Sequence, residues 1–85
     1  MVCRAKLIWD DGIWYSKVHT EAGDNVGLTL ESGSFDALVE RVKVALPEML
    51  ELNFGYSGVI HLSIEAERND YLRAVTPDGR LYATS

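Results

Sequence analysis

The sequence predicts a small α+β domain in which an antiparallel β-β-β-α-β sheet carries one amphipathic helix on one face. Three features predict this class. An Asp-Gly pair separates two alternating segments, an apolar stripe of helical period runs from Phe35 to Leu50, and a further alternating segment follows the stripe. The 85 residues leave room for one hydrophobic core, so we expect residues 1–85 to form a single domain.

The first two strands are expected to form a hairpin. Cys3, Ala5, Leu7 and Trp9 alternate with the cations Arg4 and Lys6, which is the period of a strand with one buried face. Asp11 and Gly12 suit a two-residue turn, because this turn requires positive φ at both central positions. The second strand is expected at residues 13–19.

A polar loop then leads to a short third strand at about residues 27–31, and Gly33 interrupts the pattern ahead of a helix. Ser34 is placed to cap that helix, and Asp36 adds negative charge near the positive end of the helix dipole. The helix is expected to lie on the sheet through an apolar stripe. Its members are Phe35, Leu38, Val39, Val42, Ala45, Leu46, Met49 and Leu50.

Pro47 lies inside the predicted helix. It removes the hydrogen bond to the carbonyl of Lys43, at a cost of about 3 kcal/mol in a regular interior position. The apolar stripe continues in phase on both sides of the proline. We therefore expect a kinked helix reaching about Asn53, with two short helices as the alternative.

The last part of the chain begins with a strand at about residues 59–64, where apolar residues again alternate. Residues 66–85 are expected to form a strand or hairpin tail. The Thr-Pro-Asp-Gly sequence at residues 76–79 has a strong turn composition and separates two strand-like segments, 71–75 and 80–83. A fraying end is the alternative.

The charge is acidic: 13 Asp and Glu residues against 8 Lys and Arg residues give a net charge of −5. No cluster of basic residues suits a phosphate backbone, so direct nucleic-acid binding is not expected. The charge favours a basic protein partner or serves solubility alone. No apolar stretch suits a bilayer or a signal peptide, so we expect no membrane association.

Cysteine and histidine content indicates how the small core is stabilised. A lone cysteine, Cys3, forms no internal disulfide and indicates a reducing, cytoplasmic location. His19 and His61 lie far apart in the sequence, so no metal or other cofactor is expected. Small domains often need stabilisation beyond their hydrophobic core. With no disulfide and no metal expected, self-association is the remaining source, and a homodimer is predicted.

Four carboxylates, Asp10, Asp11, Glu21 and Asp24, fall in turns that are expected at one end of the sheet. They form a contact patch for a basic partner, a divalent-metal site or ordinary solvated turns. Their spacing matches no calcium loop. We retain these four residues as candidate partner-binding residues.

Val44 lies opposite the apolar stripe on the helix, between Glu40 and Glu48. It is either an isolated exposed valine, which requires no explanation, or the centre of a partner contact. Glu40, Val44 and Glu48 are therefore further candidate partner-binding residues.

No enzyme is predicted, because neither His19 nor His61 stands near a recognisable Ser or Cys nucleophile. Trp9 and Trp14 flank the turn and are expected to pack across the hairpin.

Two alternative functions remain open. The first is a small ligand-binding or sensory module that uses the sheet face around Trp14 and His61. The second is an orphan scaffold protein without a partner.

Residues 25–42 combine a Gly-Leu turn, a short strand, a serine cap and a helix that opens with an apolar and then an acidic residue. Residues 46–53, Leu-Pro-Glu-Met-Leu-Glu-Leu-Asn, add a proline-containing helix end, and residues 12–14, Gly-Ile-Trp, open the second strand. Over residues 2–65 this pattern resembles the HicB-like antitoxin superfamily. It is more closely similar to the superfamily's short single-domain branch of bacterial proteins of unknown function.

The resemblance implies a degenerate ribonuclease-H-like fold, usually dimeric, that caps HicA, a small basic toxin that cleaves RNA. Two features depart from the family. Val26 stands where a proline usually precedes the Gly-Leu turn, and residues 67–85 are too few for the C-terminal DNA-binding domain of full-length members. Ribonuclease chemistry is not expected, because the first strand offers apolar and cationic residues and no metal-binding carboxylates.

The sequence therefore predicts a non-catalytic, HicB-like, antitoxin-type domain. It is expected to form a homodimer and to bind a small basic HicA-like toxin.

Overall fold

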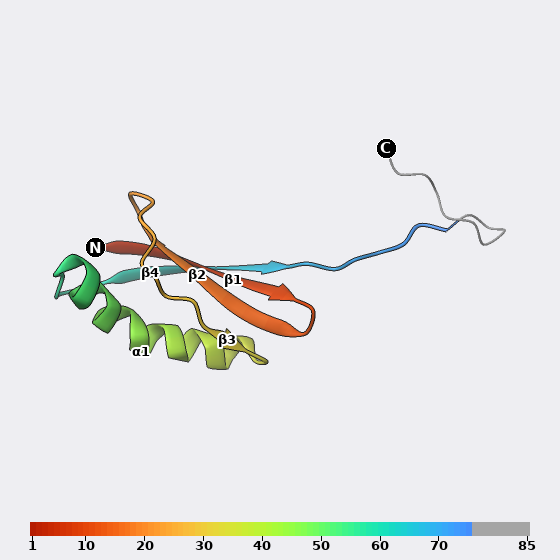
Figure 1. Ribbon diagram of the computed structural model, residues 1–85, viewed down its shortest axis with the longest axis horizontal. Coiled ribbons are helices and arrows are strands. Elements are labelled where there is room, and N and C mark those ends of the chain that lie inside the picture. The colour runs from red at the N-terminus through yellow and green to blue at the C-terminus, as the bar shows by residue number, and fades with distance from the viewer. Residues whose placement is uncertain (76–85) are drawn as a thin grey trace.

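The computed structural model describes residues 1–75. Four strands form one sheet in the order β3-β2-β1-β4, and one helix lies across one face of it (Figure 1). The elements are β1 (Val2–Asp10), β2 (Ile13–Thr20), β3 (Glu31–Ser32), α1 (Phe35–Phe54) and β4 (His61–Arg68). The predicted α+β class and its β-β-β-α-β order are confirmed.

The sheet is mixed rather than wholly antiparallel. β1 pairs antiparallel with β2, and β2 with β3, but β4 runs parallel to β1. The reason is that α1 starts near the hairpin end of the sheet and carries the chain back to the end where β1 begins, a crossover that parallel strands require. His61 consequently lies beside Val2, and both strands run in the same direction from there.

The β1–β2 hairpin has the predicted geometry. Asp10 pairs with Ile13, which leaves Asp11 and Gly12 as the turn. Their φ angles are 51° and 85°, so both central residues have the positive φ that a two-residue hairpin turn needs. The Trp9 and Trp14 rings pack across the hairpin with 5.4 Å between their centroids, as expected.

The hydrophobic core lies between the sheet and α1. Alternate residues of β1 and β2 face the helix. Four members of the apolar stripe on α1 are fully buried against the sheet. The buried core consists of Cys3, Ala5, Leu7, Val18, Val26, Leu28, Leu38, Val42, Leu46 and Leu50. The prediction that the helix packs on the sheet through this stripe is confirmed.

α1 is one helix, so the alternative of two short helices is wrong. Ser34 caps its start, where the hydroxyl accepts a 3.3 Å hydrogen bond from the Ala37 amide. The helix continues through the exposed Pro47, and Gly55, with a φ of 64°, ends it. Burial of Leu46 and Leu50 on either side of the proline offsets the missing hydrogen bond.

The segment before β3 differs from the prediction, because the strand expected at residues 27–31 is reduced to Glu31–Ser32. Gly27, with a φ of 79°, turns the chain, and the Asn25 side chain accepts a 2.7 Å hydrogen bond from the Gly27 amide. The extended residues that follow are held to β2 at Ser16. Its side chain bonds the Leu28 carbonyl and the Leu30 amide, and its own amide donates a 3.0 Å hydrogen bond to the Leu30 carbonyl.

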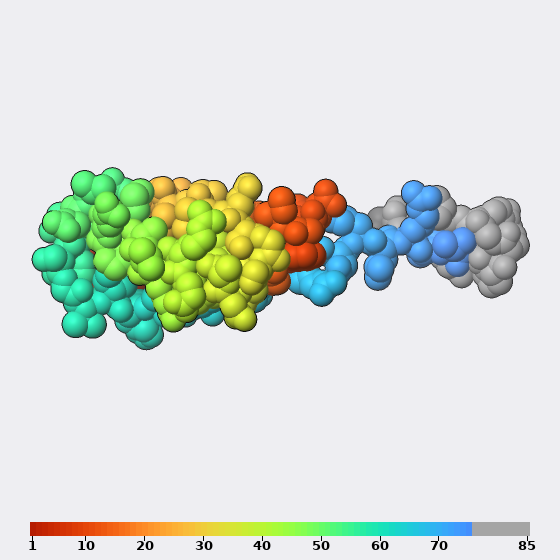
Figure 2. Space-filling view, turned by 90° about the horizontal axis from the view of Figure 1, so that it is seen from below, coloured from red at the N-terminus to blue at the C-terminus, as the bar shows by residue number. Residues whose placement is uncertain are grey.

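β4 is longer than the predicted strand at 59–64 and reaches Arg68. Its pairing continues one residue further, since the Asn69 amide donates to the Trp9 carbonyl over 3.1 Å. The chain then extends away from the body of the molecule, which α1 covers along one side (Figure 2). The predicted turn at 76–79 and the segment at 80–83 lie outside the described residues.

Candidate functional site

The four turn carboxylates do not form the single patch that the sequence predicts. Asp10 and Asp11 lie at the hairpin turn, whereas Glu21 and Asp24 follow β2 at the opposite end of the sheet. A strand rises about 3.3 Å per residue, so the length of β1 separates the two pairs. The prediction was wrong because a hairpin places its turn and its strand termini at opposite ends.

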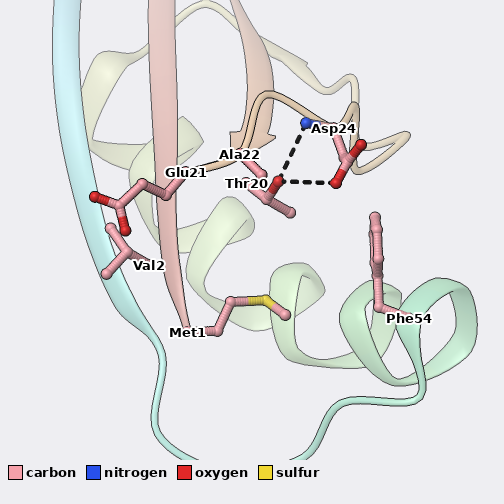
Figure 3. A pocket seen from close by; sticks show the side chains of 7 residues that line it. All are labelled: Met1, Val2, Thr20, Glu21, Ala22, Asp24 and Phe54. Carbon is pink, nitrogen blue, oxygen red and sulfur yellow. Dashed lines mark hydrogen bonds between the residues drawn. The ribbon is translucent and has the colours of Figure 1, made fainter.

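Glu21 and Asp24 both line an open hollow of about 500 Å³ at that opposite end (Figure 3). Thr20 holds Asp24 in place: its hydroxyl accepts a 3.1 Å hydrogen bond from the Asp24 amide and lies 3.4 Å from the carboxylate. The Glu21 side chain points away from Asp24, and its carboxylate lies 3.9 Å from the Arg4 guanidinium. The two carboxylates therefore do not converge on a common ligand. The remaining lining residues are Met1, Val2, Ala22 and Phe54.

A second candidate surface runs along the outer side of α1. Asp36, Glu40, Val44, Glu48 and Leu52 are spaced four residues apart, so they form one row, which we call the acidic ridge. All five are exposed, Val44 at 78%. The structure thus brings the predicted candidates on this helix together on one surface, and it separates them from the carboxylates of the turns.

A shallow apolar hollow of about 390 Å³ adjoins the acidic ridge, between α1 and the segment that leads into β3. Leu30, Val44 and Ala45 supply its apolar wall, and Glu40 and Arg41 complete the lining. Val44 is therefore not an isolated exposed valine.

Leu30 was not among the predicted site residues. A helical projection shows which residues share the outer side of α1 and does not show which loop lies beside it. Arg41 fixes this neighbour, because its guanidinium donates a hydrogen bond to the Glu31 carbonyl. The alternation of Leu28 and Leu30 was the available sequence signal, since Leu28 is buried while Leu30 is half-buried at the margin of the core.

The sheet face away from α1 is polar and mixed in charge. Lys6 lies opposite Lys17 on β2, and its ammonium is 3.6 Å from the Glu67 carboxylate on β4. A hollow of about 480 Å³ on this face is lined by both cations and carboxylates, whose charges largely cancel.

The predicted ligand face around Trp14 and His61 is not formed. Trp14 points into the space beneath α1, where its ring lies 5.0 Å from the Phe35 ring. His61 is paired with Val2, and this pair alternates with the core-facing residues, so it lies on the other face of the sheet. The two side chains are on opposite faces because their positions differ in parity relative to β1.

The titratable side chains of residues 1–75 include no group of three or more His, Cys, Asp or Glu residues arranged to hold a metal ion. Cys3 lies in the core, and burial raises the pKa of its thiol. Within the same residues, no helix combines the length and the apolar character needed to cross a bilayer.

The fold is that of a small α+β domain with a mixed four-stranded sheet and, within residues 1–75, a single covering helix that carries the acidic ridge. Residues 2–75 match the family described as a domain of unknown function (DUF1902), and the chain belongs to that family. No curated protein and no solved structure shows a significant match to the chain.

Proposed function

We propose that this chain is a non-catalytic, antitoxin-type domain of the HicB-like kind, which forms a homodimer and binds a small basic toxin-like protein through the acidic ridge. The observation that carries the proposal is Val44, which is 78% exposed beside an apolar hollow and lies between Glu40 and Glu48 on α1. An exposed apolar side chain with a hollow beside it and charge around it has the arrangement of a protein contact.

The apolar part of this surface supplies a place for a partner's side chain. Leu30 and Ala45 form the floor beside Val44, and the hollow of about 390 Å³ is open to solvent. A partner's aliphatic or aromatic group that covers them removes apolar surface from water, which stabilises the complex by about 25 cal/mol for each Å².

The carboxylates of the acidic ridge favour a partner with positive charge. Glu48 takes part in no ion pair among residues 1–75, whereas Glu40 lies 3.2 Å from Lys43. A basic partner would pair with the free carboxylates of the acidic ridge, and the net charge of −5 would attract it at longer range. A basic toxin satisfies both requirements.

The resemblance to the HicB-like superfamily supports the same class of function. The residues that carry it, 25–42 and 46–53, include Leu30 and most of the acidic ridge. The superfamily's usual role, the capping of a basic ribonuclease toxin, then accounts for an acidic domain with an apolar contact point.

The non-catalytic part of the proposal is supported by where the reactive side chains lie. The Cys3 thiol is fully buried beneath α1, and burial raises its pKa, so the nucleophilic thiolate is disfavoured. The polar sheet face that carries His19 lies on the far side of the sheet from that thiol, so no Cys–His pair forms.

Isothermal titration with the product of an adjacent short basic gene tests the proposal. The wild-type protein is expected to bind that product at micromolar concentration, with affinity that falls as salt is added. Val44→Asp is expected to weaken binding at least about 10-fold, which corresponds to about 1.4 kcal/mol. The matched control is Val59→Asp, because Val59 is 84% exposed but lies outside the acidic ridge.

Two outcomes would count against the proposal. The absence of such a gene, or of a complex at micromolar concentration, would remove the toxin-like partner. Equal weakening by Val44→Asp and Val59→Asp would show that the partner does not use the acidic ridge.

A further inference from the structure

Within residues 1–75, β4 presents a free edge of eight residues. It is the last strand in the order β3-β2-β1-β4, and β1 occupies only one of its sides. The His61 and Asn69 amides donate to the Met1 and Trp9 carbonyls, so the N–H groups at these odd-numbered positions face β1. Since N–H directions alternate along a strand, the amides of the even-numbered positions, including Ile64, point to the free edge. A long edge of this kind is a template for another strand.

Apolar surface is exposed along the same edge. Ile64 lies on the face that α1 covers elsewhere, yet it is 38% exposed, because the helix lies closest to β2 and β3, on the far side of β1 from β4. Further along, Leu72 is 94% exposed in the extended segment that follows β4 (Figure 1). Residues 1–75 leave Ile64 partly exposed and Leu72 almost fully exposed, whereas Leu62 at the start of β4 packs against the core.

The charges on β4 favour pairing of two copies near Ile64 over pairing centred further along the strand. If two antiparallel β4 strands are centred on Ile64, Ser63 lies opposite Glu65 and His61 lies opposite Glu67 of the second copy, so each carboxylate faces a donor. Centring the pair on Glu65 instead sets that carboxylate against its own copy. Centring it on Ala66 sets Glu65 against Glu67, which like-charge repulsion disfavours.

We propose that two copies of this chain form a dimer through antiparallel pairing of their β4 strands, centred on Ile64. This inference deepens the homodimer in the proposed function and rests on it, but it does not depend on toxin binding. The two sheets join into one eight-stranded sheet with both helices on the same face. The two Ile64 side chains then cover each other.

This arrangement leaves the outer side of α1 free. The acidic ridge, with Val44, points away from the sheet, and β4 lies on the opposite edge of the sheet from β3 and the Leu30 hollow.

Light scattering on Ile64→Pro tests the interface. Proline at this position removes an N–H that faces the free edge, so the hydrogen bonds to β1 remain while edge pairing is blocked. The wild-type protein is expected to show twice the 9.5 kDa chain mass, and Ile64→Pro the mass of one chain with a cooperative thermal transition retained. Ile64→Ala, which keeps the N–H, is the control and is expected to remain largely dimeric.

Oxidative cross-linking provides a second test that does not require a proline variant to fold. The Cα atoms of a hydrogen-bonded antiparallel pair lie about 5.5 Å apart, within the range for disulfides. Ile64→Cys is therefore expected to give a covalent dimer with a mild oxidant. Glu65→Cys is not, because its two copies would lie roughly 8 Å apart. The native Cys3 is buried and does not interfere.

The outcomes separate the two levels of the proposal. A wild-type protein that is monomeric at all concentrations would contradict the homodimer itself. A wild-type dimer that persists in Ile64→Pro, or that cross-links through Glu65→Cys and not through Ile64→Cys, would overturn the β4 interface and leave the homodimer standing.

Discussion

The amide of Val26 donates a 3.1 Å hydrogen bond to the carbonyl of Val18, which attaches the loop after β2 to β2 itself. The Val26 carbonyl in turn accepts a 2.9 Å hydrogen bond from the Asn53 side chain near the end of α1. A proline, the residue usual before the Gly-Leu turn in the superfamily that the sequence resembles, has no N–H to donate. Val26 therefore holds this loop through its amide, and its side chain is fully buried in the core.

Val26→Pro is expected to destabilise the protein by about 1–3 kcal/mol, because the Val18 carbonyl loses its partner. Urea denaturation measures the change. Val26→Ala is the control: it keeps the N–H and removes only side-chain volume, so its amide is expected to stay protected from hydrogen exchange. Unchanged stability in Val26→Pro would show that the hydrogen bond contributes nothing.

Ser16 is a buried hydroxyl that holds the segment before β3 in place. It accepts a 3.0 Å hydrogen bond from the Leu30 amide and lies 3.5 Å from the Leu28 carbonyl. Ser16→Ala is expected to cost about 1–3 kcal/mol, because the Leu30 amide loses its partner.

Hydrogen exchange at Leu30 separates this local role from a general loss of stability, since Leu30 also lines the hollow beside Val44. The Leu30 amide is expected to exchange faster in Ser16→Ala. Ser57→Ala, in the exposed loop before β4, is expected to change stability by no more than about 0.5 kcal/mol and to leave the exchange of the Leu30 amide unchanged. Retained protection of Leu30 would contradict the assignment.

Gly12 and Gly33 form a matched pair for testing the hairpin turn. Both have open space where a Cβ would be added, but only Gly12 has a positive φ, of 85°. Gly12→Ala is expected to destabilise the protein by about 1–2 kcal/mol, because an L side chain is strained in that conformation. Gly33→Ala is expected to be stabilising by about 0.4–1 kcal/mol, through reduced freedom of the unfolded chain. Thermal unfolding that ranks the two in the reverse order would contradict this account.

Cys3 is expected to make stability fall at alkaline pH. Burial raises the pKa of its thiol in the folded protein, whereas in the unfolded chain the thiol titrates near its ordinary value of about 8.5. Above that pH the unfolded state has lost a proton that the folded state keeps, so ionisation favours unfolding. Unfolding curves from pH 7 to 10 are expected to show this decline for the wild type, and a smaller one for Cys3→Ala.

Thiol labelling checks the same burial directly. Cys3 is expected to react with a thiol reagent only as fast as the protein opens, and urea is expected to accelerate the reaction strongly. Immediate labelling of the folded protein at pH 8 would mean that the thiol is accessible.

Features that depend on neighbouring residues were predicted correctly. The turn at Asp11 and Gly12 follows from the backbone freedom of these two residue types, and the cap at Ser34 follows from a hydroxyl placed three residues before a free amide. The apolar stripe also predicted which side of α1 faces the sheet. It correctly placed Val44 on the opposite side.

Features that depend on strand order and loop paths were predicted incorrectly or missed. The sequence placed Asp11 and Glu21 at the same end of the sheet, and Trp14 and His61 on the same face, and both pairs are separated. It also extended the third strand over residues 27–30, where the positive φ of Gly27 and the Ser16 hydroxyl set the path instead.

Local residue types were therefore enough to establish the helix, its buried side and the hairpin turn, since each follows from interactions over a few residues. The parallel placement of β4, the hollow between Leu30 and Val44 and the free edge at Ile64 arise from the way α1 crosses the sheet. That crossing depends on packing between residues far apart in the chain. No local pattern encodes it.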